Sequence, residues 1–93
     1  MENIKILVAD DDQDIRHSLQ AILETRHFTV VTAADREQGM EKVKTEKPDL
    51  LILDVMMSTW QDGFEMSRDL KNNPQYKSIP ILMLTGIKGN DRY

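Results

Sequence analysis

Three apolar runs constrain the fold of this chain more than any other feature. They span residues 4–9 (IKILVA), 50–55 (LLILDV) and 79–85 (IPILMLT). Their interiors are nearly continuously apolar rather than alternating, which is typical of strands buried on both faces of a parallel sheet. A fourth run, residues 28–33 (FTVVTA), is β-branched and less apolar, so we expect it to form an edge strand.

A helical pattern follows the first apolar run. Ile15, Leu19, Ile22 and Leu23 recur at the spacing of one apolar helix face. Asp12 stands just before this periodic segment, where a carboxylate can accept hydrogen bonds from the first free amides of a helix. The sequence therefore predicts an amphipathic helix capped by Asp12.

A second helix is predicted from a capping-box pattern. Asp35 is followed three residues later by Gln38, and Pro48 forbids continuation of the helix. We expect Met40 and Val43 to face inward from this helix.

A third helix is predicted in the same way. Asp62 is followed by Glu65, and the breaker cluster at residues 72–74 ends the pattern. We expect Phe64 and Leu70 to face inward here. The resulting order, in which strands and helices alternate, predicts an α/β layered fold with right-handed crossovers.

Composition limits the classes of function. The 93 residues suit a single domain spanning 1–93, with 40% hydrophobic and 30% charged residues. A net charge of -4 and scattered basic residues argue against direct nucleic-acid contact and against a membrane-surface patch. There is no cysteine, no signal-peptide pattern and no apolar stretch long enough for a membrane span, so we expect a cytoplasmic protein.

Polar residues stand where the predicted strands end. Asp10 and Asp11 follow the first strand, Asp54 ends the third and Thr85 ends the fourth. In open parallel sheets the carboxyl ends of the strands form the ligand-binding edge. We therefore expect these four residues to lie close together.

Asp54 is the unusual member of this group because it interrupts an apolar run. A buried carboxylate without a partner is unfavourable, and three carboxylates at one edge repel one another. A divalent cation would relieve this repulsion. Mg²⁺ is the best candidate, because it takes oxygen ligands, needs only one or two carboxylates and retains several waters.

The same arrangement suits chemistry at phosphorus. A carboxylate can be the nucleophile that forms an aspartyl-phosphate, and phosphoryl transfer needs mainly in-line positioning and neutralised oxygen charge. The Thr85 hydroxyl and nearby backbone amides could donate hydrogen bonds to the phosphoryl oxygens. The residues themselves thus indicate a Mg²⁺-dependent phosphoacceptor at Asp54.

At this point the chain resembles a family, the receiver domains of bacterial two-component response regulators. The resemblance rests on an ordered set of segments that covers essentially the whole chain. These are ILVADDDQDIR, EKPDLLILDVMM, DGFEM and IPILMLTG. It implies a flavodoxin-like, doubly wound parallel sheet of (βα) units.

The resemblance also implies site roles and partners. Asp54 would accept a phosphoryl group from the phosphohistidine of a sensor histidine kinase or a phosphotransfer protein. Asp10, Asp11, Asp54 and the backbone carbonyl of Met56 would bind Mg²⁺. Thr85 would contact the phosphoryl group and move as a switch. Such a domain is a phosphoacceptor with Mg²⁺-dependent self-phosphorylation and dephosphorylation, rather than a classical enzyme.

The chain departs from the family pattern in two places. Ser58 stands where a proline is usual, and the segment before Asp62 is one residue longer than usual. Receivers normally continue through a further helix, strand and helix that carry a lysine which pairs with the phosphoryl group. Lys88 is too close to Thr85 to be that residue, so we expect a receiver that lacks its last helix, strand and helix.

Two alternatives stay open at this stage. The chain could be a pseudo-receiver, which would be a protein-interaction module with this fold but without working phosphotransfer. A metal-dependent aspartyl hydrolase fits less well, because that class usually has a second Asp where this chain has Met56. The exposed fourth strand also predicts self-association of the shortened chain through its edge.

Overall fold

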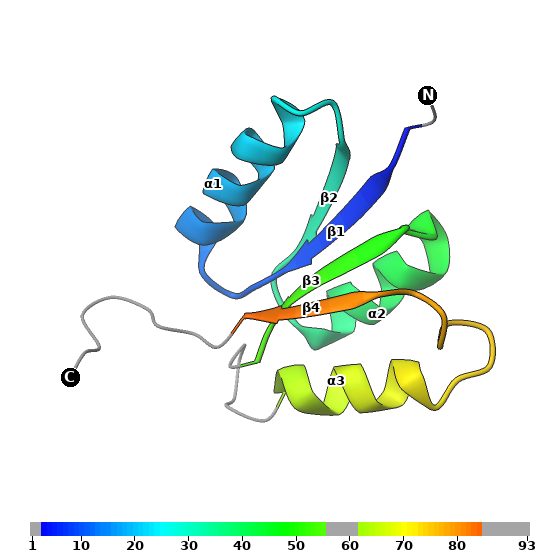
Figure 1. Ribbon diagram of the computed structural model, residues 1–93. Helices are drawn as coiled ribbons and strands as arrows, with labels where there is room; N and C mark the ends of the chain where they lie inside the picture. The colour runs from blue at the N-terminus through cyan, green and yellow to red at the C-terminus, as the bar shows by residue number, and fades with distance from the viewer. Residues whose placement is uncertain (1–2, 56–61, 85–93) are drawn as a thin grey trace.

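Four parallel strands form a single sheet in the order β2-β1-β3-β4 (Figure 1). This computed structural model describes residues 3–55 and 62–84. The strands are β1 (Lys5–Ala9), β2 (Thr29–Ala33), β3 (Leu50–Asp54) and β4 (Ile81–Leu84), and the helices are α1 (Gln13–Glu24), α2 (Arg36–Glu46) and α3 (Asp62–Lys71). The strand order and alternation confirm the predicted flavodoxin-like α/β fold, and β2 lies at an edge as expected.

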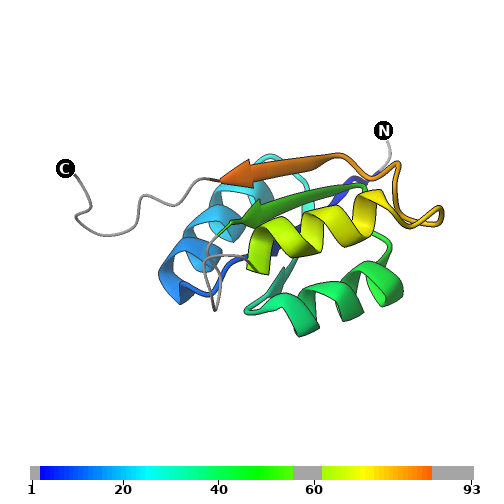
Figure 2. The same ribbon diagram turned by 90° about the horizontal axis from the view of Figure 1, so that it is seen from below.

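The two central strands are buried on both faces, as their continuous apolar sequences predict. One face of the sheet packs against α2 and α3, which lie side by side (Figure 2). Its buried cluster consists of Leu7, Ala9, Ala33, Val43, Leu51, Leu53, Met66 and Leu70. The other face packs against α1, and its smaller buried cluster consists of Ile6, Val8, Val30 and Ile52. We call these the two-helix face and the one-helix face.

The start of α1 confirms the predicted cap. The Asp12 carboxylate accepts hydrogen bonds from the amides of Asp14, at 2.9 Å, and Ile15, at 3.2 Å. These amides have no partner inside the helix, so the cap satisfies donors that the helix itself leaves open.

The start of α2 confirms the second predicted cap, with one difference. Asp35 accepts from the Gln38 amide at 2.8 Å, but the Gln38 side chain accepts from the amide of Ala34 rather than from that of Asp35. The helix ends at Lys47, which adopts a left-handed conformation with φ of 51° just before Pro48. This conformation is where glycine is usual, so the chain turns here despite a side chain.

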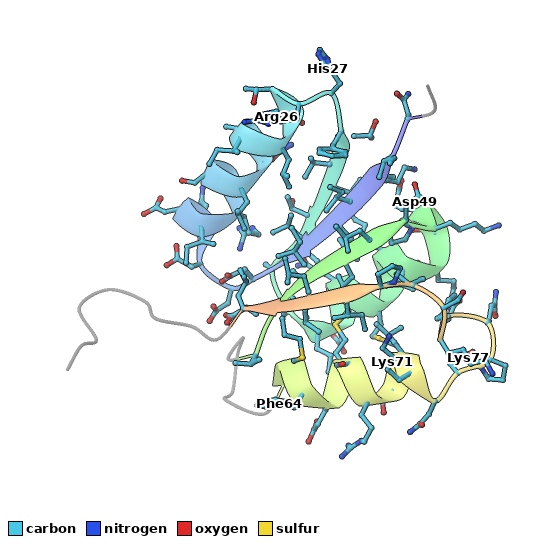
Figure 3. The ribbon with its side chains drawn as sticks, in the orientation of Figure 1. Arg26, His27, Asp49, Phe64, Lys71 and Lys77 are labelled. Carbon is cyan, nitrogen blue, oxygen red and sulfur yellow. The ribbon has the colours of Figure 1, made fainter. Side chains whose placement is uncertain are left out.

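The prediction that Phe64 faces inward is wrong. Phe64 is 50% exposed, and Figure 3 shows it at the start of α3 on the side away from the sheet. The prediction for Leu70 is confirmed, and it shares the inward face of α3 with Gly63 and Met66 at helical spacing. Gly63 lies against the end of β3, where a Cβ would overlap the backbone of Asp54 and Val55.

The predicted apolar stripe of α1 is only partly correct. Leu19 and Leu23 pack against the buried cluster of the one-helix face, whereas Ile22 is 58% exposed. No residue of α1 is fully buried. Among the described residues the helix packs mainly against β1 and β2, so part of its apolar stripe remains exposed.

The strand β4 forms the second edge of the sheet built by the described residues. Leu82 on this strand is 53% exposed, in agreement with the expectation of an open apolar edge. Within residues 3–55 and 62–84, no helix is both long enough and apolar enough to cross a membrane.

Candidate phosphoacceptor site

The carboxyl ends of β1 and β3 bring three carboxylates together. Asp10 and Asp11 follow β1 directly, and Asp54 is the last residue of β3. One carboxylate oxygen from each lies within 4.8 Å of the others. Figure 1 shows why residues so far apart in sequence meet, because β1 and β3 are neighbours that run in the same direction.

The three carboxylates differ sharply in exposure. Asp10 is 2% exposed and Asp54 is 1% exposed, whereas Asp11 is exposed to solvent. The cluster therefore has a buried floor of two carboxylates and one side that opens to water. A reactant can approach from that side while the buried oxygens remain fixed.

Hydrogen bonds hold Asp10 from three directions. Its amide donates to the carbonyl of Ala33 at 3.0 Å, and its Oδ1 accepts from the amide of Asp12 at 2.9 Å. Its backbone carbonyl accepts from Nη1 of Arg16 at 2.8 Å. Arg16 was not among the predicted site residues. Its position six residues after Asp10, in the first turns of α1, is the signal that could have suggested it.

The backbone around Asp54 is held from both sides. Asp54 pairs with Leu84 in the register between β3 and β4, and the Val55 amide donates to the Leu84 carbonyl at 3.2 Å. On the other side the Gly63 amide donates to the Val55 carbonyl at 3.1 Å. Gly63 was not among the predicted site residues either, although the Asp-Gly pair at the start of α3 belongs to the DGFEM segment.

Several predicted positions lie outside the described residues. They are Met56, Ser58 and Thr85. The backbone carbonyl proposed as a metal ligand and the predicted switch hydroxyl therefore stay predictions. The described residues bring Asp10, Asp11 and Asp54 together. The described ranges end at residues 55 and 84, just before Met56 and Thr85.

The donor set suits a hard divalent cation. Carboxylate oxygens are the ligands that Mg²⁺ prefers, and Mg²⁺ commonly uses one or two of them beside several waters. Asp11 is the exposed member of the cluster, so it is the carboxylate in contact with solvent. The burial of Asp10 and Asp54 adds a reason for a cation, because a bound cation offsets the loss of solvation of two neighbouring carboxylates.

The sequence matches the family model of the response regulator receiver domain over residues 6–93. It is 47% identical over 83 residues to the alkaline phosphatase synthesis transcriptional regulatory protein PhoP of Bacillus subtilis. The aligned region covers 89% of this chain and 33% of PhoP. It is 31% identical over 88 residues to protein PilG of Pseudomonas aeruginosa. The aligned region covers 95% of this chain and 64% of PilG.

The fold also matches solved structures. The chemotaxis response regulator CheY4 of Vibrio cholerae superposes with a TM-score of 0.85 at 34% identity, covering 95% of this chain and 72% of CheY4. The chain spans about a third of the length of PhoP and of the mycobacterial regulators MprA. The family match spans residues 6–93, and the structural match to CheY4 covers 95% of the chain. The chain belongs to the response regulator receiver domain family.

Proposed function

We propose that this receiver domain is a Mg²⁺-dependent phosphoacceptor in two-component signal transduction, with Asp54 as the residue that is phosphorylated. The observation that carries the proposal is the cluster of Asp10, Asp11 and Asp54, whose oxygens lie within 4.8 Å of one another at the carboxyl edge of the sheet. Asp54 is 1% exposed and ends the central strand β3, and it is the residue that the family resemblance implies as the phosphoacceptor.

The residues divide into ligands and nucleophile. Asp10, Asp11 and Asp54 would hold Mg²⁺ together with the backbone carbonyl of Met56. The bound ion would neutralise negative charge on the phosphoryl oxygens, which is a main requirement of phosphoryl transfer. The buried position of Asp10, fixed by its three backbone and side-chain hydrogen bonds, would keep its carboxylate aimed at the cluster.

The chemistry that this chain contributes is nucleophilic. A carboxylate oxygen of Asp54 attacks the phosphorus of a phosphohistidine in line with the bond to the imidazole nitrogen. The new P–O bond forms as the P–N bond breaks, and the electron pair leaves with the imidazole nitrogen. Thr85 would donate a hydrogen bond to the transferred group and shift on phosphorylation. Attack of water on phosphorus later returns the free carboxylate.

The partners follow from the family. Response regulators receive phosphoryl groups from histidine kinases or phosphotransfer proteins. We propose a partner of that kind in the cytoplasm for this chain.

Labelling with a small phosphodonor tests the proposal. The wild-type chain, incubated with acetyl phosphate and Mg²⁺, should gain one phosphoryl group by intact-mass spectrometry. Asp54→Asn should abolish this gain, because the amide is not a nucleophile toward phosphorus. Asp14→Asn is a matched control, since Asp14 is an exposed first-turn residue outside the cluster and its substitution should leave labelling intact.

Two outcomes would reject the assignment. Equal labelling of wild type and Asp54→Asn would place the phosphoacceptor elsewhere. Absence of both Mg²⁺ binding and labelling in the folded wild-type chain would favour the pseudo-receiver, in which the fold serves only to bind another protein.

We also propose that the 93-residue polypeptide by itself associates with a second copy through β4. This strand is an edge of the sheet in the described part of the chain, and its Leu82 is half exposed. Unpaired amides and carbonyls on an apolar edge are a template for pairing with another strand. Light scattering that shows only monomer at high concentration would reject this proposal.

A further inference from the structure

Gly63 makes an unusually close approach to the residue that carries the proposed chemistry. A Cβ built on Gly63 would lie 2.2 Å from the Asp54 carbonyl oxygen, 2.4 Å from Val55 Cα and 2.8 Å from the Val55 carbonyl carbon. All three are backbone atoms, and contacts below 3.0 Å are essentially never seen for a real Cβ. No rotation of a side chain can therefore make room for one.

The approach is also a bonded contact. The Gly63 amide donates to the Val55 carbonyl at 3.1 Å, while the Val55 amide donates to Leu84 on β4. The end of β3 is thus held between β4 on one side and the first turn of α3 on the other. The Val55 carbonyl that Gly63 binds immediately precedes Met56, whose carbonyl is the proposed fourth ligand.

The second described helical glycine makes a close approach to a side chain rather than to backbone. A Cβ on Gly39 would meet Met66 Cε at 2.8 Å and Met66 Sδ at 3.1 Å, with Ala9 Cβ next at 3.8 Å. Met66 contributes the flexible end of its side chain, which can move to a new rotamer. Both glycines are buried on the two-helix face, but only Gly63 presses on backbone.

We propose that Gly63 is a positioning residue for the phosphoacceptor site, because its missing side chain lets α3 set the backbone of Asp54 and Val55. This inference rests on the proposed function. Any side chain at position 63 must displace either α3 or the end of β3. Because Asp54 ends that strand, displacement changes the direction of its carboxylate relative to Asp10 and Asp11.

The test compares Gly63→Ala with Gly39→Ala in the full chain. Both variants place a methyl group on a buried helical glycine. Mg²⁺ affinity is measured by isothermal titration calorimetry, phosphorylation rate with acetyl phosphate, and stability by urea unfolding. Gly63→Ala should weaken Mg²⁺ binding by about tenfold or more, as supporting residues around metal ligands commonly do. Gly39→Ala should leave the affinity within about twofold, since its methyl would overlap only the movable end of Met66 and would lie at an ordinary contact distance from Ala9.

Metal-free spectra provide a readout that activity does not. In ¹⁵N-correlated NMR spectra without Mg²⁺, Gly63→Ala should shift the amide signals of Asp54 and Val55, whereas Gly39→Ala should not. A folded Gly63→Ala chain with wild-type Mg²⁺ affinity and unshifted Asp54 and Val55 signals would overturn the inference.

If Gly63→Ala fails to fold, a Mg²⁺ titration of the wild-type protein tests the inference instead. Mg²⁺ titrated into the wild type should shift the Gly63 amide signal, which is bonded to the strand end, and leave that of Gly39 in place. An unchanged Gly63 signal on saturation with Mg²⁺ would overturn the inference. Failure of the proposed function is distinguishable, because the wild type itself would then show neither Mg²⁺ binding nor labelling, and this inference would fall with it.

Discussion

The two faces of the sheet are built from alternate residues of the same strands, yet they are covered very differently. The two-helix face buries eight cluster residues under α2 and α3. The one-helix face buries four under α1, a helix with no fully buried residue. Apolar residues reach the surface on the less covered side, as the half-exposed Ile22 and Leu82 show.

This difference assigns separate tasks to the faces. The two-helix face supplies tight packing and includes the contact between α3 and the end of β3, which we propose positions Asp54. The one-helix face supplies Asp10 and Asp11 through the turn into α1, where hydrogen bonds rather than packing dominate. The acidic cluster lies at the carboxyl edge of the sheet, where residues positioned by both faces meet. Mutations that are matched across the faces should therefore have unequal effects.

The largest difference is expected between two neighbouring strand residues. Leu51 is fully buried on the two-helix face, and Ile52 is 6% exposed on the one-helix face. Leu51→Ala should lower the free energy of unfolding by about 4 kcal/mol, and Ile52→Ala by about 2 kcal/mol, since the better-covered site leaves the larger cavity. Urea unfolding measures both values. Equal losses would show that α1 covers its face as well as the helix pair covers the other.

Helix residues should show the same inequality at a smaller scale. Leu70 of α3 is fully buried, and Leu23 of α1 is half-buried against the smaller cluster. Leu70→Ala should cost about 3 kcal/mol and Leu23→Ala about 1 kcal/mol, because the transfer and cavity contributions both scale with burial. Thermal and urea unfolding of each variant checks the order. A larger loss for Leu23 would reverse the comparison.

Local hydrogen bonds should matter more on the one-helix face. The Asp12 carboxylate caps α1 through two amides, whereas the Asp35 carboxylate caps α2 through one. Asp12→Ala should lower the free energy of unfolding by about 1.5 kcal/mol, and Asp35→Ala by about 0.7 kcal/mol. Hydrogen exchange of the first amides of α1 should rise most in Asp12→Ala. If Asp35→Ala proves the more costly, α1 does not depend on its cap in this way.

The smallest effect on stability is expected at the exposed edge. Leu82→Lys should change the free energy of unfolding by about 0.5 kcal/mol or less, because about half of Leu82 is already exposed. The new charge should instead reduce self-association of the chain, since edge lysines discourage strand pairing. Gln75→Lys adds the same charge at an exposed loop position and serves as the control in sedimentation experiments. Equal association of both variants would move the interface away from β4.

Much of the fold could be read from the sequence because burial on both faces leaves a distinctive signal. The continuous apolar runs predicted a parallel sheet, and their lengths exceed the observed strands by only one to three residues. The caps at Asp12 and Asp35 were also predictable, since a carboxylate before a periodic segment has a local role. The errors at Ile22 and Phe64 arose where a residue's exposure depends on a neighbour distant in sequence.

The residues of the candidate site also differ in whether the sequence alone could predict them. The positions of Asp10, Asp11 and Asp54 followed from strand ends that the sequence reveals. The supporting contacts of Arg16 and Gly63 did not, because each depends on how a helix is rotated against the sheet. A helix pattern fixes spacing along the chain but not the few ångströms that separate a helix backbone from a strand end.

By itself the sequence therefore determined the order of elements, the parallel sheet and the set of acidic residues at one edge. These depend on hydrophobic period and on the direction of strands, which are local properties joined by simple topology. Only the tertiary structure decided that Asp10 and Asp54 are buried while Asp11 meets solvent, and that a glycine in α3 touches the backbone of Asp54. Packing between distant segments sets burial and close approach, because side-chain volumes on both sides must fit at once.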